Sequence, residues 1–383
     1  MNKFYNFWSI LLGVLMTFSS CHVQKKNQAE NTIIENQWQP LQTIDEAGLI
    51  GERADLWRDN RLWYIGKSDY IIDGFGNRPG MHPWQGEHLG KWLHAATLAY
   101  NINGDEKLKM KLDEMVERLL ATQLSDGYMG TYGESYTFMA SPENDMKTKL
   151  ADDIQPASKK ANPADSDKVP GGGCDTWTIR YNIYGLLTYE KYFPNKEVVE
   201  ACKKMGDLLI EYYGEGKYDL TKYGTRNGIS ATVLLESIVM LYERTLDKRY
   251  LDFAEHIVKV SEENPKHRLM GTMLEKGSVV YPGDGKGYQL MANLLGYLRL
   301  YRSTGNEKYL QTALHGWHEI QEKHFLTTGD TWTRKMNHNG TKECFANQAA
   351  FNTKKIVGEG CCDATWIQLN INLCEFTGTA KYL

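Results

Sequence analysis

A short turn recurs five times along the chain, and each copy separates two stretches whose apolar residues fall at helical spacing. Short turns between amphipathic helices make those helices antiparallel neighbours. Such hairpins cannot each bury their own apolar face, so they must stack on one another, and strand signals are scarce by comparison. We therefore predict an all-α chain, an (α/α)6 toroid built of antiparallel helical hairpins. The turns occupy residues 101–105, 193–195, 245–251, 304–310 and 377–383.

Composition agrees with one large domain and narrows the range of partners. With 383 residues, 42% of them hydrophobic, the chain can bury a single large core. The net charge of -4 leaves no basic stripe to neutralise phosphates, so we expect no nucleic-acid partner. The 23 tyrosines, 11 phenylalanines and 10 tryptophans supply flat rings of the kind that stack on sugars, although most of them should be core.

The first 21 residues are typical of an export signal. A basic start at Lys3 precedes an apolar run from Trp8 to Phe18, and small serines stand directly before Cys21. This pattern resembles the lipobox of bacterial lipoproteins, in which diacylglycerol is attached to the cysteine. We predict a signal peptide over 1–20, a polar tether lipid-anchored through Cys21 over 21–44, and the toroid over 45–383. The protein would then sit in the cell envelope as a periplasmic or outer-membrane lipoprotein; a plain secreted protein is the alternative.

Two further segments bear on the shape of the toroid. Residues 136–173 are too long for a simple connection, and three glycines at 171–173 lead into a predicted helix capped by Asp175 or Thr176. We expect this loop at the mouth of a cavity. The chain stops at Leu383, where other copies of the hairpin begin their second helix, so we expect a toroid that is incomplete at the C-terminus.

The densest chemical cluster combines carboxylates with thiols. Glu343 precedes Cys344, and Glu359 is followed by the pair Cys361 and Cys362. A zinc ion accepts both oxygen and sulfur ligands in tetrahedral geometry, and it keeps a coordinated thiol deprotonated. An exported protein also oxidises neighbouring thiols, so a disulfide among these three cysteines and Cys174 is an open alternative.

The segment from Glu359 to Asn370, with the Thr-Gly turn at 377–378, is similar without gaps to the pattern Glu-Thr-Cys-Asn-Thr-Tyr-Asn-Met-Leu-Lys-Leu-Thr of the glycoside hydrolase family 127 β-L-arabinofuranosidases. Residues 123–132 and 87–93 also resemble segments of that family. The resemblance implies zinc bound by Glu359 and Cys361, to which we add Cys362 as a candidate ligand. It also implies a general acid/base sixteen residues before Glu359, a position that is Glu343 here.

This resemblance implies a retaining glycosidase acting on terminal L-arabinofuranose-like sugars of a polysaccharide or glycoconjugate, through a thioglycoside intermediate. Three features depart from the family pattern. The family's nucleophilic cysteine pair lies downstream of the last residue here, and Tyr181 and Tyr288 stand where relatives present histidines to the sugar. The substrate should therefore differ from a simple β-L-arabinofuranoside.

The remaining candidates and alternatives rest on position alone. Besides the two tyrosines, we predict sugar contacts by Trp84, His88 and Trp177. Trp332 is a further stacking candidate, and His82 and His338 could also face the cavity. Two other functions stay open: a non-catalytic glycan-binding lipoprotein, and a toroid polysaccharide lyase or sugar epimerase that abstracts a proton with Tyr or His. Cys202 and Cys374 fall in apolar helical stretches and are predicted core residues.

Overall fold

The structure is a computed structural model that describes residues 48–82, 84–133, 138, 174–223, 226–325, 332–334, 344–345 and 356–382. Within these residues the chain is almost entirely helical. The helical elements are α2 (Leu49–Leu56), a π-helical segment (Trp57–Leu62), α3 (Trp63–Lys67), α4 (Tyr70–Gly76), α5 (Glu87–Asn103), α6 (Glu106–Leu120), α7 (Asp175–Tyr192), α8 (Lys196–Tyr213), α9 (Ile229–Thr232), α10 (Leu234–Thr245), α11 (Lys248–Glu263), α12 (Leu269–Lys276), α13 (Gly287–Thr304), α14 (Glu307–Lys323) and α15 (Gly360–Thr377), with short 3-10 turns at Leu220–Lys222 and Ala380–Tyr382.

One small sheet interrupts this pattern. Strand β1 (Trp332–Arg334) pairs antiparallel with β2 (Ile356–Gly358), and Thr333 stands opposite Val357. The strand β2 leads directly into α15, so the sheet fixes the direction from which the chain enters that helix.

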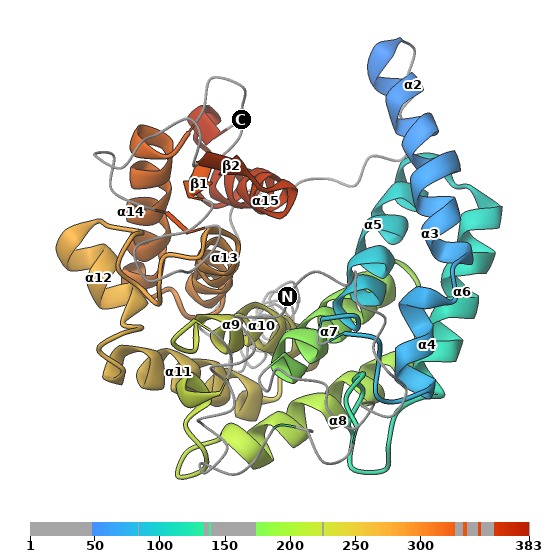
Figure 1. Cartoon of the computed structure of the whole chain (residues 1–383), viewed down its shortest axis with the longest axis horizontal. Helices are drawn as coiled ribbons and strands as arrows, with labels where there is room; N and C mark the ends of the chain where they lie inside the picture. The colour runs from blue at the N-terminus through green and yellow to red at the C-terminus, as the bar shows by residue number, and fades with distance from the viewer. Residues whose placement is uncertain are drawn as a thin grey trace, which may run out of the picture.

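The hairpins are arranged as an arc around a common axis (Figure 1). Its inner layer runs through α5, α7, α10, α13 and α15, and each of these helices packs on the next. The partners α6, α8, α11 and α14 lie outside them, each packed on the helix that precedes it in the chain. The predicted all-α fold of antiparallel hairpins is confirmed.

Helices end and begin at the predicted turns, and side-chain capping explains why the second helix of a hairpin starts there. In four hairpins an Asp or Asn stands just before the second helix, and its side chain accepts hydrogen bonds from backbone N–H groups of the first turn. The apolar spacing around the first turn predicts helices over 88–100 and 106–122. These are α5, which extends a few residues beyond the predicted range, and α6, which ends two residues before the end of its own. The capping residues are Asp105, Asn195, Asp247 and Asn306.

The predicted cap of α7 is wrong. Cys174 occupies the position before the helix and makes no capping bond through its side chain. Asp175, one residue further on, lies inside the helix, where its carboxylate accepts hydrogen bonds from the Tyr128 hydroxyl at 3.2 Å and from the Phe138 amide at 2.6 Å. The carboxylate is thus turned toward a buried loop instead of its own helix end.

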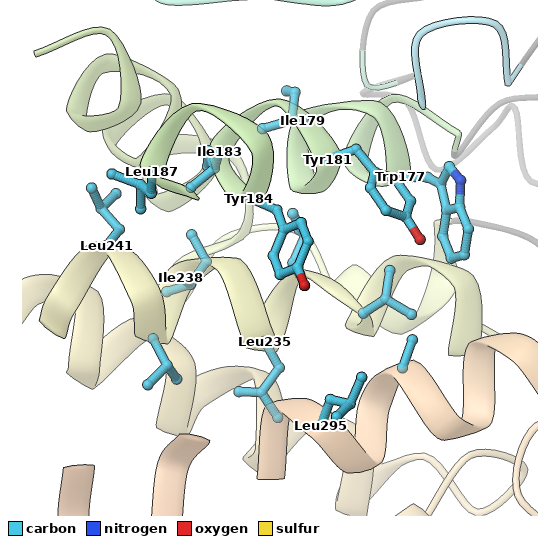
Figure 2. Close-up of a cluster of buried hydrophobic side chains, with 14 of the residues drawn as sticks. Trp177, Ile179, Tyr181, Ile183, Tyr184, Leu187, Leu235, Ile238, Leu241 and Leu295 are labelled. Atoms are coloured by element: carbon cyan, nitrogen blue, oxygen red, sulfur yellow. The ribbon is translucent and has the colours of Figure 1, made fainter. Parts of the chain in front are cut away.

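The core lies between the inner helices. Nearly every residue of α7 is buried, because α5, α8 and α10 all pack on it. Figure 2 shows Ile183 and Leu187 of α7 opposite Ile238 and Leu241 of α10, while Trp177, Tyr181 and Tyr184 point toward the inner side. Cys202 and Cys374 are buried among apolar neighbours, as predicted.

Several predictions concern residues that the structure does not describe. The leader over 1–20, the tether over 21–44 with Cys21, Glu343, His338 and nearly all of the loop over 136–173 lie outside the described residues. In the parts that are described, no helix combines the length and the apolar character needed to cross a membrane.

Candidate active site

Polar contacts join residues at or near the N-termini of four inner helices, α5, α7, α13 and α15. Trp177 in the first turn of α7 donates its ring N–H to Glu87, the first residue of α5. Tyrosine hydroxyls join α7 to α13, and Lys286 before α13 pairs with Glu359 before α15. Helix N-termini expose unpaired N–H groups and a partial positive charge, which stabilise carboxylates placed there. We take this junction as the candidate site.

Glu87 and Lys91 form its centre. The Lys91 ammonium lies 3.0 Å from one Glu87 oxygen, and the Trp177 ring N–H donates to the other. Burial lowers the pKa of Lys91, but the charges of Tyr181, Glu87 and Cys361 outweigh it, so the pKa of Lys91 is raised. Lys91 therefore stays an ammonium, and Glu87 is held between a cation and an indole N–H.

Two buried tyrosines face one another at the same place. Tyr181 of α7 and Tyr288 of α13 touch through their hydroxyl oxygens. The ammonium of Lys91 lies above both rings, 4.8 Å from the Tyr181 centroid and 5.1 Å from that of Tyr288, and the Trp177 ring meets both edge-on. The two tyrosines for which the family resemblance implies histidines are thus in direct contact, and a ligand would meet an aromatic surface with two hydroxyls at its centre.

Glu359 and the vicinal cysteines form the adjoining part of the site. The carboxylate of Glu359 accepts from the Lys286 ammonium at 2.8 Å, and the Cys362 thiol donates to the same oxygen at 3.4 Å. Burial raises the pKa of the Cys361 thiol; Lys91 acts against that rise and Glu359 adds to it. Cys361 thus lies within the electrostatic reach of both halves of the site.

Cys344 places the predicted acid segment near Lys286. The backbones of Lys286 and Cys344 form an isolated antiparallel bridge. The Cys344 sulfur lies 3.8 Å from an Asp284 oxygen and 4.0 Å from the Arg226 guanidinium. Burial and the Asp284 charge raise the pKa of this thiol. The residue that directly follows Glu343 is therefore at the edge of the candidate site.

The predicted contacts Trp84 and His88 belong to a neighbouring aromatic cluster, just before and within the first turn of α5. The Tyr70 hydroxyl and the His82 Nε2 are 2.5 Å apart, and the His82 ring lies 5.2 Å from Trp84 and 5.8 Å from His88. Burial lowers the pKa of His82, and His88 lowers it further. Trp84 is 41% exposed, so its ring is open to solvent while Trp177 is buried.

The structure thus brings together six of the predicted residues and adds three that sequence reasoning missed. The predicted ones are Trp177, Tyr181, Tyr288, Glu359, Cys361 and Cys362. Glu87, Lys91 and Lys286 were missed because a charged residue on a helix or in a glycine-rich loop is usually solvated. The spacing of four between Glu87 and Lys91, on the buried side of an otherwise apolar helix, was the one available signal.

The expected zinc site stays a prediction. Among the described residues, no three His, Cys, Asp or Glu side chains gather as a metal site. Glu359 is already paired with Lys286, and Cys362 is a protonated donor to it, whereas zinc binds deprotonated ligands. No disulfide joins Cys174, Cys344, Cys361 and Cys362 in the part of the chain that the structure describes.

Comparison with known proteins agrees with the motif match. The family model described as "Beta-L-arabinofuranosidase, GH127 catalytic domain" matches residues 17–383. The chain belongs to this family. A curated relative, the non-reducing end β-L-arabinofuranosidase of Bifidobacterium longum subsp. longum, is 22% identical over 270 residues, which are 64% of this chain and 37% of the relative.

Solved structures of GH127 proteins share the fold. A GH127 β-arabinofuranosidase superimposes with a TM-score of 0.61 at 16% identity, covering 87% of this chain and 50% of the other. A GH127 β-L-arabinofuranosidase from Geobacillus stearothermophilus T6 also gives a TM-score of 0.61, at 15% identity, with 92% of this chain and 54% of the other covered. This GH127 chain thus spans about half the length of these structures and just over a third of the curated relative.

Proposed function

We propose that this GH127 protein is an exported glycoside hydrolase that releases terminal L-arabinofuranose-like sugars from a polysaccharide or glycoconjugate. The observation that carries the proposal is the junction of α5, α7, α13 and α15. There a carboxylate, an ammonium and three aromatic rings meet at helix N-termini in a chain of this family. Rings for stacking and charged groups for hydroxyl recognition are what a sugar site requires.

Each side chain has a distinct part in this proposal. Glu87 and Lys91 would bind sugar hydroxyls, as acceptor and donor. Tyr181 and Tyr288 would meet the ring of the terminal sugar, and their shared hydroxyl contact would select against substrates that need an imidazole partner. Trp84, being exposed, would contact the next sugar or the aglycone.

We further propose that Glu343 is the general acid and base, on the spacing to Glu359 that the family resemblance supplies. It would protonate the oxygen of the leaving group and then take a proton from the attacking water. In the retaining mechanism that the family resemblance implies, a cysteine thiolate would displace the leaving-group oxygen from the anomeric carbon, and water would then displace the thiolate, so the two displacements retain the configuration. Proton NMR of the first-formed sugar, read before mutarotation, checks retention: the inverted anomer would contradict it.

Hydrolysis itself is tested with the protein expressed from its native locus and an aryl β-L-arabinofuranoside, by release of the aryl alcohol. Glu343→Gln should lower kcat by about a hundredfold or more, the range for loss of a general acid. Glu322→Gln, an exposed glutamate on the outer helix α14, is the matched control and should act as wild type. No release by the wild-type chain from a panel of α- and β-furanosides would refute the hydrolase proposal.

A non-catalytic glycan-binding protein is the second candidate. Polar groups of the site already bind one another in the pairs Lys286–Glu359 and Tyr181–Tyr288, and groups held in this way are less available for proton transfer. Affinity electrophoresis in arabinan-containing gels measures binding without turnover. Retarded migration together with intact glycan would favour this candidate. An unsaturated product that absorbs in the ultraviolet would instead identify a lyase.

We also propose that the chain is exported and anchored by lipid at Cys21. The basic, apolar and small-residue segments that precede this cysteine support the proposal. Mass spectrometry of the N-terminal peptide should show a diacylated cysteine, and Cys21→Ala should move the protein from the membrane to the soluble fraction. An N-terminus that keeps residues 1–20 would contradict it.

A further inference from the structure

A buried ammonium group lies against the carboxylate for which the family resemblance implies a metal. The Lys286 side chain is only 4% exposed and that of Glu359 is 17% exposed, and the two are joined at 2.8 Å. A lysine this deeply buried needs an anionic partner to remain charged. Glu359 is the carboxylate that supplies it, so the two charges neutralise one another within the protein.

The backbone holds Lys286 firmly in this position. It is the residue directly before α13, its N–H donates to an Asp284 oxygen at 3.3 Å, and it forms the backbone bridge with Cys344. The ammonium is therefore carried by a fixed point at the start of an inner helix. It is not a long surface side chain that happens to reach the pocket.

A zinc ion at Glu359 would conflict with this arrangement on two counts. The metal would compete with Lys286 and Cys362, which both bind one oxygen of Glu359, for the negative charge of this carboxylate, and it would place two further positive charges next to a buried ammonium. The pocket is complete as a charge pair without a metal.

We propose that Lys286 is the resident cation of the Glu359 pocket and that it excludes zinc from this pocket. The proposal goes beyond sugar hydrolysis, because it concerns which cation neutralises Glu359. It can be read without any substrate, so its failure and the failure of the proposed function are separate results.

The test compares zinc retention by the full chain and three variants. Each protein is incubated with zinc sulfate, passed through a desalting column and analysed by plasma mass spectrometry. Lys286→Met removes the ammonium and keeps the length of the side chain. Lys286→Arg keeps a cation. The double variant Lys286→Met with Glu359→Gln removes both charges and controls for zinc held elsewhere, for example by the cysteines.

Wild type and Lys286→Arg should retain less than about a tenth of a zinc ion per chain above the double variant, and Lys286→Met should retain about one.

Because Lys286→Met leaves Glu359 unpaired, melting temperatures are measured with zinc and with chelator. Zinc should raise the melting temperature of this variant and leave that of wild type unchanged. Lys286→Gln, which keeps a hydrogen-bond donor for Glu359, serves if Lys286→Met does not fold. About one zinc ion in wild type, or equal zinc in wild type and the Lys286 variants, would overturn the proposal.

Discussion

Asp175 is a carboxyl group inside the protein without a cationic partner among its hydrogen bonds. Burial raises its pKa to about 7 from an ordinary value of 3.8, although the Phe138 amide and the Tyr128 hydroxyl both favour the charged form. Between these two pKa values the native state binds more protons than the unfolded chain. The contribution of this group to stability is therefore complete below about pH 4 and is lost as pH rises toward 7.

We predict that Asp175→Asn flattens the fall of unfolding free energy between pH 5 and pH 8. A shift of this size corresponds to about 4 kcal/mol over its full range, as an upper value. Urea unfolding at the two pH values measures the difference. Asp126→Asn, in the exposed loop before Tyr128, is the control and should keep the wild-type slope. Equal slopes for wild type and Asp175→Asn would show that this carboxyl does not titrate in the range.

Single residues of the site were predictable where a motif carries them. Glu359, Cys361 and Cys362 are neighbours in sequence, and Trp177 and Tyr181 share one helix face, so local spacing is enough to group them. The contact between Tyr181 and Tyr288 joins residues more than a hundred positions apart, and no local pattern contains it. The same holds for Lys286, whose burial depends on how α13 meets α15.

At the level of elements, the repeated turn offers an internal comparison. After α5 and α13 the chain places Gly104 and Gly305 in the left-handed conformation, at φ 67° and 69°. The corresponding position after α10 is Leu246, with φ 56° and 73% exposure. A side chain in this conformation costs about 1 kcal/mol, and glycine removes that cost.

We predict that Leu246→Gly stabilises the chain by up to about 1 kcal/mol. The substitution loses little packing because the leucine is exposed, and the terminal hydrogen bond to Tyr242 is made by the backbone. Chemical denaturation measures the gain. The reverse change, Gly305→Leu, should destabilise the chain by a similar amount, and a stability change of the same sign in both variants would contradict the argument.

The close crossing of α5 and α7 gives a second prediction for elements. A methyl group on Gly90 would lie 2.1 Å from the Tyr181 carbonyl oxygen, and one on Gly185 would lie 2.4 Å from the Gly90 carbonyl oxygen. We expect Gly90→Ala to cost about 1–3 kcal/mol and to displace Tyr181 from Tyr288. Gly76→Ala, in α4 with open space around it, should change stability by less than about 0.5 kcal/mol. Tyrosine fluorescence and thermal unfolding of both variants report the outcome, and equal stability would contradict the crossing.

Helices and their turns could be predicted because capping residues and apolar periodicity are local properties. The boundaries of α5 and α6 came within a few residues of the predicted ones. The small sheet of β1 and β2 was not predicted, since its strands are three residues long and pair across more than twenty residues. The cap of α7 was mistaken for a related reason: Asp175 finds its partners in a distant loop, so its role is set by tertiary contacts.

For the whole molecule, the stacking of hairpins follows from their unpaired apolar faces, but the curvature of the arc does not. Curvature depends on how closely inner helices approach, and this is decided by residues such as Gly90 and Gly185. It also depends on buried charges between the inner helices. Sequence reasoning gave the class of fold and left open which polar residues would lie on the axis.

Buried charged residues connect the inner helices α7, α10 and α13, and we expect these ion pairs to couple the unfolding of the three helices. Arg180 of α7 binds Glu236 of α10 at 2.6 Å, with side chains 3% and 4% exposed, and Arg299 of α13 lies 3.6 Å from the other Glu236 oxygen. Arg180→Met leaves Glu236 buried with a weaker partner, so we expect a loss of about 3–5 kcal/mol. Replacing both Arg180 and Glu236 by Met removes the buried charges together and should cost less than the single change, because Arg299 retains Glu243 at 3.2 Å. Urea unfolding of the single and double variants gives the coupling energy. A double variant that loses as much stability as the two single changes added together would show that Arg180 and Glu236 are not coupled between α7 and α10.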